Sequence, residues 1–141
     1  MSFLDWEKKF STDDTKIDDQ HQKWIGYLNE LHEATQDGRS VTDQLEILDN
    51  FVIYTRYHFA SEESFLKRVD YPEIDELHRI HVEMAQKVLA EQKRIVAEQH
   101  NIGLEFLCWL RAWIVGHLVQ DDSKYARYLA RQPREEPELA F

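Results

Sequence analysis

The most constraining feature of the sequence is a histidine and a glutamate four residues apart inside an apolar pattern of helical period. His58 and Glu62 fall in a ladder of mainly apolar residues, formed by Leu45, Leu48, Val52, Thr55, Phe59, Glu62, Phe65 and Leu66. On an α-helix this spacing puts both polar side chains on one face, one turn apart. That face is expected to pack against a core. A carboxylate directed into a core is unfavourable unless a cation neutralises it, so the segment requires a basic partner or a metal ion.

Composition narrows the class of protein. The chain has 141 residues and a formal net charge of −10, with a single cysteine. The length fits one domain with a real core. The acidic balance argues against nucleic acid and anionic membrane surfaces as partners, and one cysteine allows neither an internal disulfide nor a thiolate metal cluster. The sequence shows no membrane-spanning run and no signal-peptide pattern, so we expect a cytoplasmic protein without membrane insertion.

The same helical period recurs along the chain and predicts four amphipathic helices. They are expected at about residues 17–36, 41–69, 73–98 and 104–131, with Gly38 and Tyr71-Pro72 in connections. Short connections favour an all-α, antiparallel up-down-up-down four-helix bundle. Residues 1–16 are apolar enough to form an ordered N-terminal arm. We therefore expect one domain over residues 1–131 and a loose, charged tail over residues 132–141.

Each predicted helix carries a histidine in or beside its inward ladder. These are His21, His58, and either or both of His78 and His81, followed by His117 on the last helix. One such histidine is usually an ordinary core residue, but four on four helices, together with Glu62 and an aspartate soon after His117, indicate a metal site. Imidazole and carboxylate suit iron, zinc, copper or manganese. Five or more ligands exceed the needs of one tetrahedral ion and would serve two carboxylate-bridged ions about 3.5–4 Å apart.

Several motifs, in order and at matching spacing over about residues 3–130, carry a family resemblance. They are Trp6, Ile17-Asp18-Asp19-Gln20-His21, Asn29-Glu30-Leu31, His58-Phe59-Ala60-Ser61-Glu62-Glu63, Tyr71-Pro72, His81, Trp113, His117, Asp122 and Tyr125. With these residues the chain resembles the hemerythrins of the bacterial single-domain type. The resemblance implies a non-heme di-iron centre, oxo- or hydroxo-bridged, that binds O2 reversibly as hydroperoxide at one open iron.

The resemblance also implies roles for individual residues. Glu62 and Asp122 correspond to the bridging carboxylates. His21 and His58 resemble the ligands of the iron that takes O2, and His81 and His117 resemble ligands of the other iron. The residues that would line the O2 pocket are Trp24, Phe59, Trp113 and Ile114.

The third predicted helix departs from the family pattern. The family has a histidine four residues before His81, where this chain has Leu77, and His78 stands next to it. On an ideal helix His78 is turned about 60° from His81, on the side away from Leu77. Two alternatives follow, and we slightly favour the first. Either His78 reaches the iron through a shifted or loosened first turn, or that iron lacks one imidazole and has water or an open position.

The fourth predicted helix poses a choice between two aspartates. His117 and Asp122 are five residues apart, about 140° around a regular helix, so regular geometry would select Asp121. The family spacing selects Asp122. A π-bulge or a local bend would reconcile the two, and such bulges favour functional sites. We side with Asp122.

The leading functional hypothesis is therefore a di-iron protein that binds O2 for carriage, storage or sensing; a carrier or sensor is favoured over an enzyme, and the choice stays open. If Leu77 removes one iron ligand, the alternative is an oxidase or peroxidase-like di-iron protein. A third possibility is an iron or redox sensor that signals to a partner protein. A metal-free bundle, in which basic residues neutralise Glu62 and Asp122, is the least favoured because the predicted helix interiors offer no inward lysine or arginine.

Overall fold

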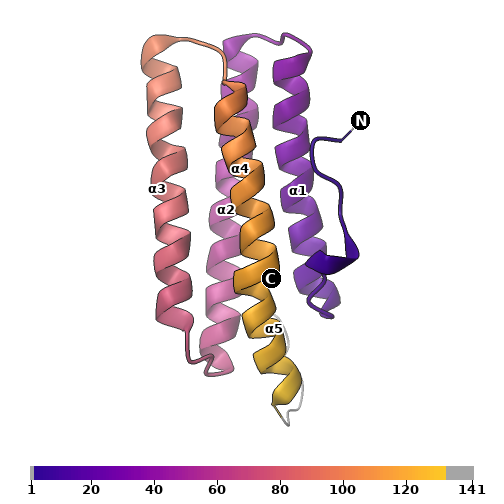
Figure 1. Cartoon of the computed structure of the whole chain (residues 1–141). Helices are drawn as coiled ribbons and strands as arrows, with labels where there is room; N and C mark the ends of the chain where they lie inside the picture. Colours follow the sequence, from indigo (N-terminus) through magenta and orange to yellow (C-terminus); the bar gives the residue numbers. More distant parts are fainter. Residues whose placement is uncertain (1, 133–141) are drawn as a thin grey trace.

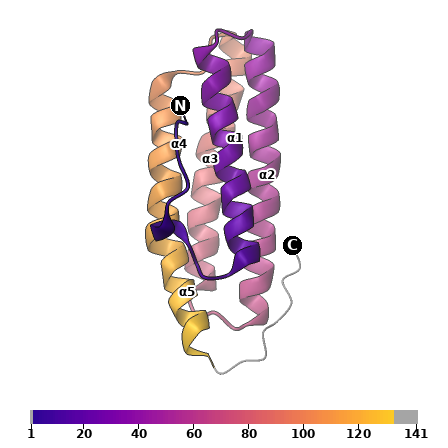
Figure 2. The ribbon, with the colours of Figure 1, turned by 90° about the vertical axis from the view of Figure 1, so that its right-hand side faces the viewer.

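The computed structural model describes residues 2–132, and its four helical rods lie side by side (Figures 1 and 2). Successive rods run in opposite directions and are joined at their ends, which confirms the predicted all-α four-helix bundle. The fourth rod consists of three segments in sequence. The elements are η1 (Lys8–Phe10), α1 (Thr15–Gln36), α2 (Val41–Arg68), α3 (Ile74–Glu98), α4 (Leu104–Gly116), η2 (His117–Asp121) and α5 (Asp122–Arg131).

The helix ends follow local chemistry. The Asp14 side chain accepts a hydrogen bond from the Ile17 N–H at 3.0 Å, so α1 begins two residues before the predicted start. The Ser40 hydroxyl likewise accepts from the Asp43 N–H at 3.1 Å at the start of α2. Gly38 follows α1 with φ +66°, a left-handed conformation that glycine adopts without steric penalty. These signals keep the connections short and the rods antiparallel.

The expected N-terminal arm packs between α1 and α4 (Figure 2). Leu4 and Phe10 are buried in it. The Leu4 backbone donates to Asn29 Oδ1 at 2.8 Å, and Asn29 Nδ2 donates back to the Leu4 carbonyl at 2.9 Å. Arg111 on α4 covers the Phe3 ring, 4.1 Å from its centroid. The proposed tail, apart from Gln132, lies outside the described residues.

The buried apolar residues in the described part of the chain form two clusters rather than one. The larger contains Trp24, Phe59, Met84 and Ile114 and extends toward the α1–α2 and α3–α4 connections. The smaller, near the α2–α3 connection and α5, contains Ile17, Phe65, Leu66, Tyr71, Leu77, Tyr125 and Leu129. Each rod passes from one cluster to the other at a buried polar residue. The polar residues therefore form a layer across the bundle, between the two apolar clusters.

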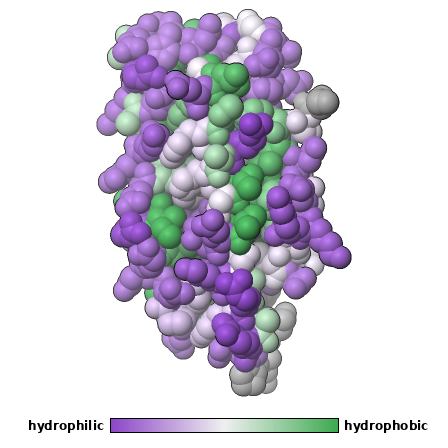
Figure 3. All heavy atoms as spheres, viewed as in Figure 1, coloured by the Kyte–Doolittle hydropathy of each residue, from purple (hydrophilic) through white to green (hydrophobic). Residues whose placement is uncertain are grey.

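On the face that carries α4, the surface is mainly hydrophilic, with hydrophobic side chains in a broken lengthwise stripe (Figure 3). Within the described residues, no helix is long and apolar enough to cross a membrane.

Candidate metal centre

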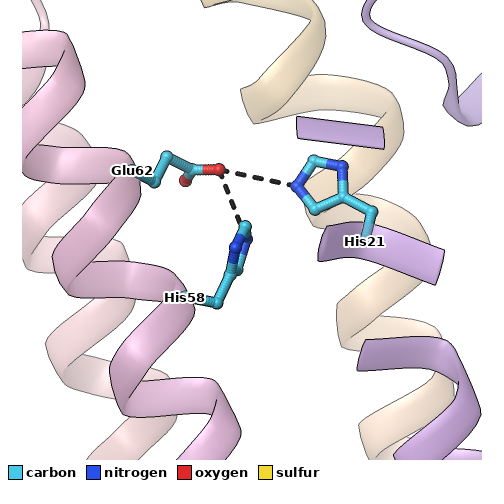
Figure 4. Close-up of side chains that lie close together, drawn as sticks. All are labelled: His21, His58 and Glu62. Atoms are coloured by element: carbon cyan, nitrogen blue, oxygen red, sulfur yellow. Dashed lines mark ion pairs between the residues drawn. The ribbon is translucent and has the colours of Figure 1, made fainter. Parts of the chain in front are cut away.

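The polar layer between the two clusters brings six predicted ligands together. They are His21, His58, Glu62, His81, His117 and Asp122, each at most 2% exposed. His21 from α1 faces His58 and Glu62 from α2 across the bundle (Figure 4). The Nε2 atoms of His21 and His58 lie 3.5 and 3.4 Å from Glu62 Oε2. The first half of the site is thus two imidazoles around one carboxylate oxygen.

The second half of the site mirrors the first. His81 Nε2 on α3 lies 3.2 Å from the other oxygen of the same glutamate, Glu62 Oε1, and His117 Nε2 lies 3.9 Å from it. Asp122 repeats this division, with Oδ2 3.1 Å from His21 Nε2 and Oδ1 3.2 Å from His117 Nε2. Each carboxylate therefore presents one oxygen to each histidine pair, which is the arrangement that a bridging carboxylate requires.

The donor atoms are arranged to bind cations rather than to form hydrogen bonds with one another. The Nδ1 atoms of His81 and His117 face carboxylates and so carry their hydrogens, yet the two Nε2 atoms point at each other 3.3 Å apart. Two nitrogen lone pairs at this distance repel unless a proton or a metal ion lies between them. Two groups of three donors, His21–His58–Glu62 and Glu62–His81–His117, each have their ligand atoms within 4.8 Å of one another.

Unpaired polar atoms point to the same conclusion. Within the described residues, the buried atoms without a hydrogen-bond partner include both ring nitrogens of His21, His58 Nε2, Glu62 Oε1 and both carboxylate oxygens of Asp122. Some of these atoms are close to one another, but their orientation is not that of a hydrogen bond. Buried polar groups are rarely left unpaired. The charged partners of Glu62 and Asp122 are all histidines, with no lysine or arginine among them in residues 2–132.

The electrostatics of the layer favour positive charge. Burial opposes protonation of His21, but Asp122 and Glu62 outweigh it and raise its pKa to about 9. Burial also opposes protonation of His117. The neighbouring Asp122, Asp121 and Glu62 outweigh this effect and raise the pKa of His117 to about 10. His58 has a lowered pKa because burial outweighs its attraction to Glu62. Burial opposes ionisation of Glu62, but the surrounding histidines hold its pKa well below the usual value. The layer thus stabilises positive charge, and a bound metal ion would replace the protons on His21 and His117.

A π-helical turn places Asp122, rather than Asp121, between His21 and His117. The Asp122 N–H donates to the His117 carbonyl, five residues back, across η2. This wider turn brings Asp122 to the face of His117 that looks into the bundle, and leaves Asp121 beside the ring, accepting from His117 Nδ1 at 2.8 Å. Asp121 is half-buried rather than solvated. The local distortion that reconciles geometry with family spacing is therefore present.

The structure does not bring His78 to the centre. Its Nδ1 contacts Glu63 Oε1 at 2.5 Å, and its side chain is 60% exposed. The first turn of α3 is neither shifted nor loosened toward the site, and Leu77 occupies the inward position, 3% exposed. Of the two alternatives for α3, the geometry supports the one in which His78 is not a ligand.

Three of the four predicted pocket residues lie against the histidines, and all four belong to or pack on the larger cluster. Phe59 stacks on His81 with centroids 3.8 Å apart, and Trp113 stacks on His117 at 4.7 Å. Trp24 is 5.3 Å from the His58 ring. Trp24 and Ile114 are fully buried, whereas Trp113 is half-buried. They form an apolar cover over one side of the polar layer.

Sequence reasoning missed residues that hold the ligands. Gln20 Oε1 accepts from His58 Nδ1 at 2.7 Å, and Glu63 Oε2 accepts from His81 Nδ1 at 2.8 Å. The Tyr125 hydroxyl donates to Glu62 Oε2 at 2.9 Å. Burial, Asp122 and Glu62 raise the pKa of Tyr125 well above its usual value, which keeps it a donor. Two sequence features could have indicated these residues. Gln20 and Glu63 each adjoin a predicted ligand in sequence, and Tyr125 lies on the inward face of the last predicted helix.

Together, the fold and the site define a helical bundle with a buried cation-binding centre of histidines and carboxylates. Residues 12–129 match the family described as the hemerythrin HHE cation binding domain. The chain belongs to the hemerythrin family.

Individual relatives agree with this assignment, and a solved structure agrees with the fold. The chain is 32% identical over 127 residues to a bacteriohemerythrin of Stenotrophomonas maltophilia, which covers 89% of this chain and 81% of that protein. It is 30% identical over 125 residues to a bacteriohemerythrin of Pseudomonas aeruginosa, with 89% and 80% covered. A crystal structure of wild-type hemerythrin superposes with a TM-score of 0.85 at 24% identity, covering 92% of this chain and 99% of that one, and shows likeness of fold.

Proposed function

We propose that the protein holds two iron ions in the polar layer and binds O2 reversibly there. The observation that carries the proposal is the division of Glu62 and Asp122, each of which presents one oxygen to each histidine pair. His21 and His58 would hold one ion, and His81 and His117 the other. Imidazole and carboxylate donors suit iron, and the hemerythrin resemblance favours it over zinc or manganese.

The iron ions, when bound, supply the electrons and the Lewis acidity for binding O2. The chain's own residues position and protect them. Gln20, Glu63 and Asp121 fix three imidazole rings with Nε2 directed inward. Trp24, Phe59, Trp113 and Ile114 exclude water on one side of the layer, which slows the proton access that promotes autoxidation.

The test begins with metal content. Protein reconstituted anaerobically with Fe²⁺ is expected to hold two iron ions per chain, measured by elemental analysis. Addition of O2 should then produce a visible absorption band that disappears when O2 is removed under argon and returns on re-exposure. Irreversible bleaching without a recoverable band, or a chain that holds no pair of ions, would contradict the proposal; metal-free protein is the control.

A second candidate, an oxidase or peroxidase-like reaction at the same ions, is favoured by one observation. Leu77 stands where the family pattern has a histidine, so the ion at His81 and His117 has fewer protein donors than the family implies. Steady consumption of O2 or hydrogen peroxide in the presence of a reductant would support this candidate. Stoichiometric, reversible uptake without turnover would support O2 binding alone.

A further inference from the structure

We infer that the ion held by His81 and His117 takes a small exogenous ligand of its own, so that both ions have an open position. The inference rests on the proposed di-iron centre. The ligand class is a small uncharged molecule of the size of water, nitric oxide or hydrogen peroxide.

The first step is the division of donors. Each half of the centre offers two imidazoles and one oxygen from each of Glu62 and Asp122. Two histidines with carboxylates are a ligand set that leaves positions of iron open to other molecules. Because both halves offer the same set, neither ion is better filled by protein than the other.

The second step concerns α3, which gives the centre a single donor. Residues four apart on a helix share a face, and the residue one turn before His81 is Leu77. Its side chain is buried in the smaller cluster and offers no lone pair. His78 is directed to Glu63 instead. Within the described residues, therefore, no third imidazole from α3 reaches this half of the centre.

The third step is access. A pocket of about 90 Å³ lies on the outer side of Leu77, with walls that include Ile80, Asp121 and Lys124. Leu77 is one turn from His81, and Asp121 holds His117 Nδ1, so the pocket borders neighbours of both donors of this ion. About 10–15 Å³ suffices for one water, and the pocket is several times larger.

Charge selects among ligands for this pocket. Glu73 and Glu76 join Asp121 in its wall, against the ammonium group of Lys124 and the guanidinium group of Arg79, which pairs with Glu76. The net charge that remains at the wall is negative and disfavours anions, whereas uncharged ligands enter without this penalty. Apolar side chains adjoin both halves of the centre, because Trp24 lies against His58 whereas Phe59 and Trp113 stack on His81 and His117. The difference between the two open positions would lie in the pocket, which borders neighbours of His81 and His117, rather than in the donor set.

The experiment counts nitric oxide bound to the anaerobic diferrous protein, by absorption and Mössbauer spectroscopy. The intact protein should bind two molecules per pair of ions. Leu77→His, which adds an imidazole one turn from His81, should reduce this to one, and Leu77→Ile, which adds no donor, should leave it unchanged. One molecule bound by the intact protein, or two bound by a folded, fully loaded Leu77→His variant, would overturn the inference.

The intact-protein result stands even if Leu77→His fails to fold. The iron count distinguishes failure of the proposed function from failure of this inference. A chain without two ions contradicts the proposed function, whereas a chain with two ions that binds one nitric oxide contradicts only the second open position.

The route is tested separately by stopped-flow mixing. Ile80→Phe narrows the pocket and should slow one of the two binding phases severalfold, with the stoichiometry unchanged. Val82→Phe, on the exposed side of the same helix, is the matched control and should change neither phase. Equal rates in Ile80→Phe and the control would exclude the pocket as the path.

Discussion

Three imidazole rings in the centre each donate a hydrogen bond, through the ring nitrogen that faces away from the centre, to another residue. Gln20, Glu63 and Asp121 each accept the Nδ1 hydrogen of one histidine. This contact fixes the tautomer and directs Nε2 toward the position of a metal, as the outer partners of metal-ligating histidines generally do. Gln20 is the one uncharged member of this set, and it is 6% exposed. Its loss would leave the His58 N–H buried without an acceptor.

Substitution of Gln20 tests this positioning role. Gln20→Leu should weaken iron binding by about 10–100-fold, because His58 is no longer held in one tautomer and orientation. The unpaired N–H should also lower the free energy of unfolding by about 1–3 kcal/mol. Metal affinity is measured by competition with a chelator. Gln22→Leu, at an exposed position on the same helix, is the control, and equal affinities for the two variants would exclude the role.

At the scale of elements, the sequence predicted much of the architecture because apolar periodicity and helix caps are local signals. His21, His58, Glu62, His81 and His117 could be placed on inward faces from spacing alone. Asp122 could not, because its orientation depends on one π turn that regular geometry does not contain. His78 was assigned toward the metal, but its ring turns to Glu63, which spacing within one helix does not reveal.

The π turn gives two adjacent aspartates different roles, which paired variants can separate. Asp122→Asn removes the anionic oxygens between His21 and His117 and should abolish stable binding of the second ion. Asp121→Asn keeps an oxygen acceptor beside His117 and should retain two ions with weakened affinity. Iron per chain after gel filtration distinguishes them. The reverse order of effects would assign the bridge to Asp121.

The N-terminal arm is a second element whose attachment depends on few contacts. Asn29 makes two hydrogen bonds to the Leu4 backbone, which fix the arm against α1. At about 1 kcal/mol for each bond, Asn29→Ala should lower the free energy of unfolding by about 2 kcal/mol. It should also make the arm more sensitive to limited proteolysis. Glu30→Ala, at the exposed neighbouring position, should change neither property; similar cleavage of both variants would contradict the prediction.

For the whole molecule, the polar layer is the level of the bundle at which side chains from all four rods meet. Among residues 2–132, the larger cluster contains 21 buried apolar residues and the smaller only seven, so in this part of the chain the bundle beside α5 has little core of its own. Ligands from α1, α2, α3, η2 and α5 meet between the clusters. Bound metal would therefore connect the smaller cluster to the larger one as well as stabilise the fold.

Metal removal should consequently destabilise the protein unevenly. A ligand that binds only the folded state adds about 2.7 kcal/mol at a hundred times its Kd, so the metal-free protein should melt at a clearly lower temperature by calorimetry. Hydrogen exchange should rise most around Ile17, Leu77 and Tyr125, because their cluster loses its link to the larger core, and least around Leu28 and Leu107 in the larger cluster. Reloading with Fe²⁺ should restore both properties. A uniform rise in exchange along all four rods would show that the layer stabilises the bundle as one unit and does not join two unequal parts.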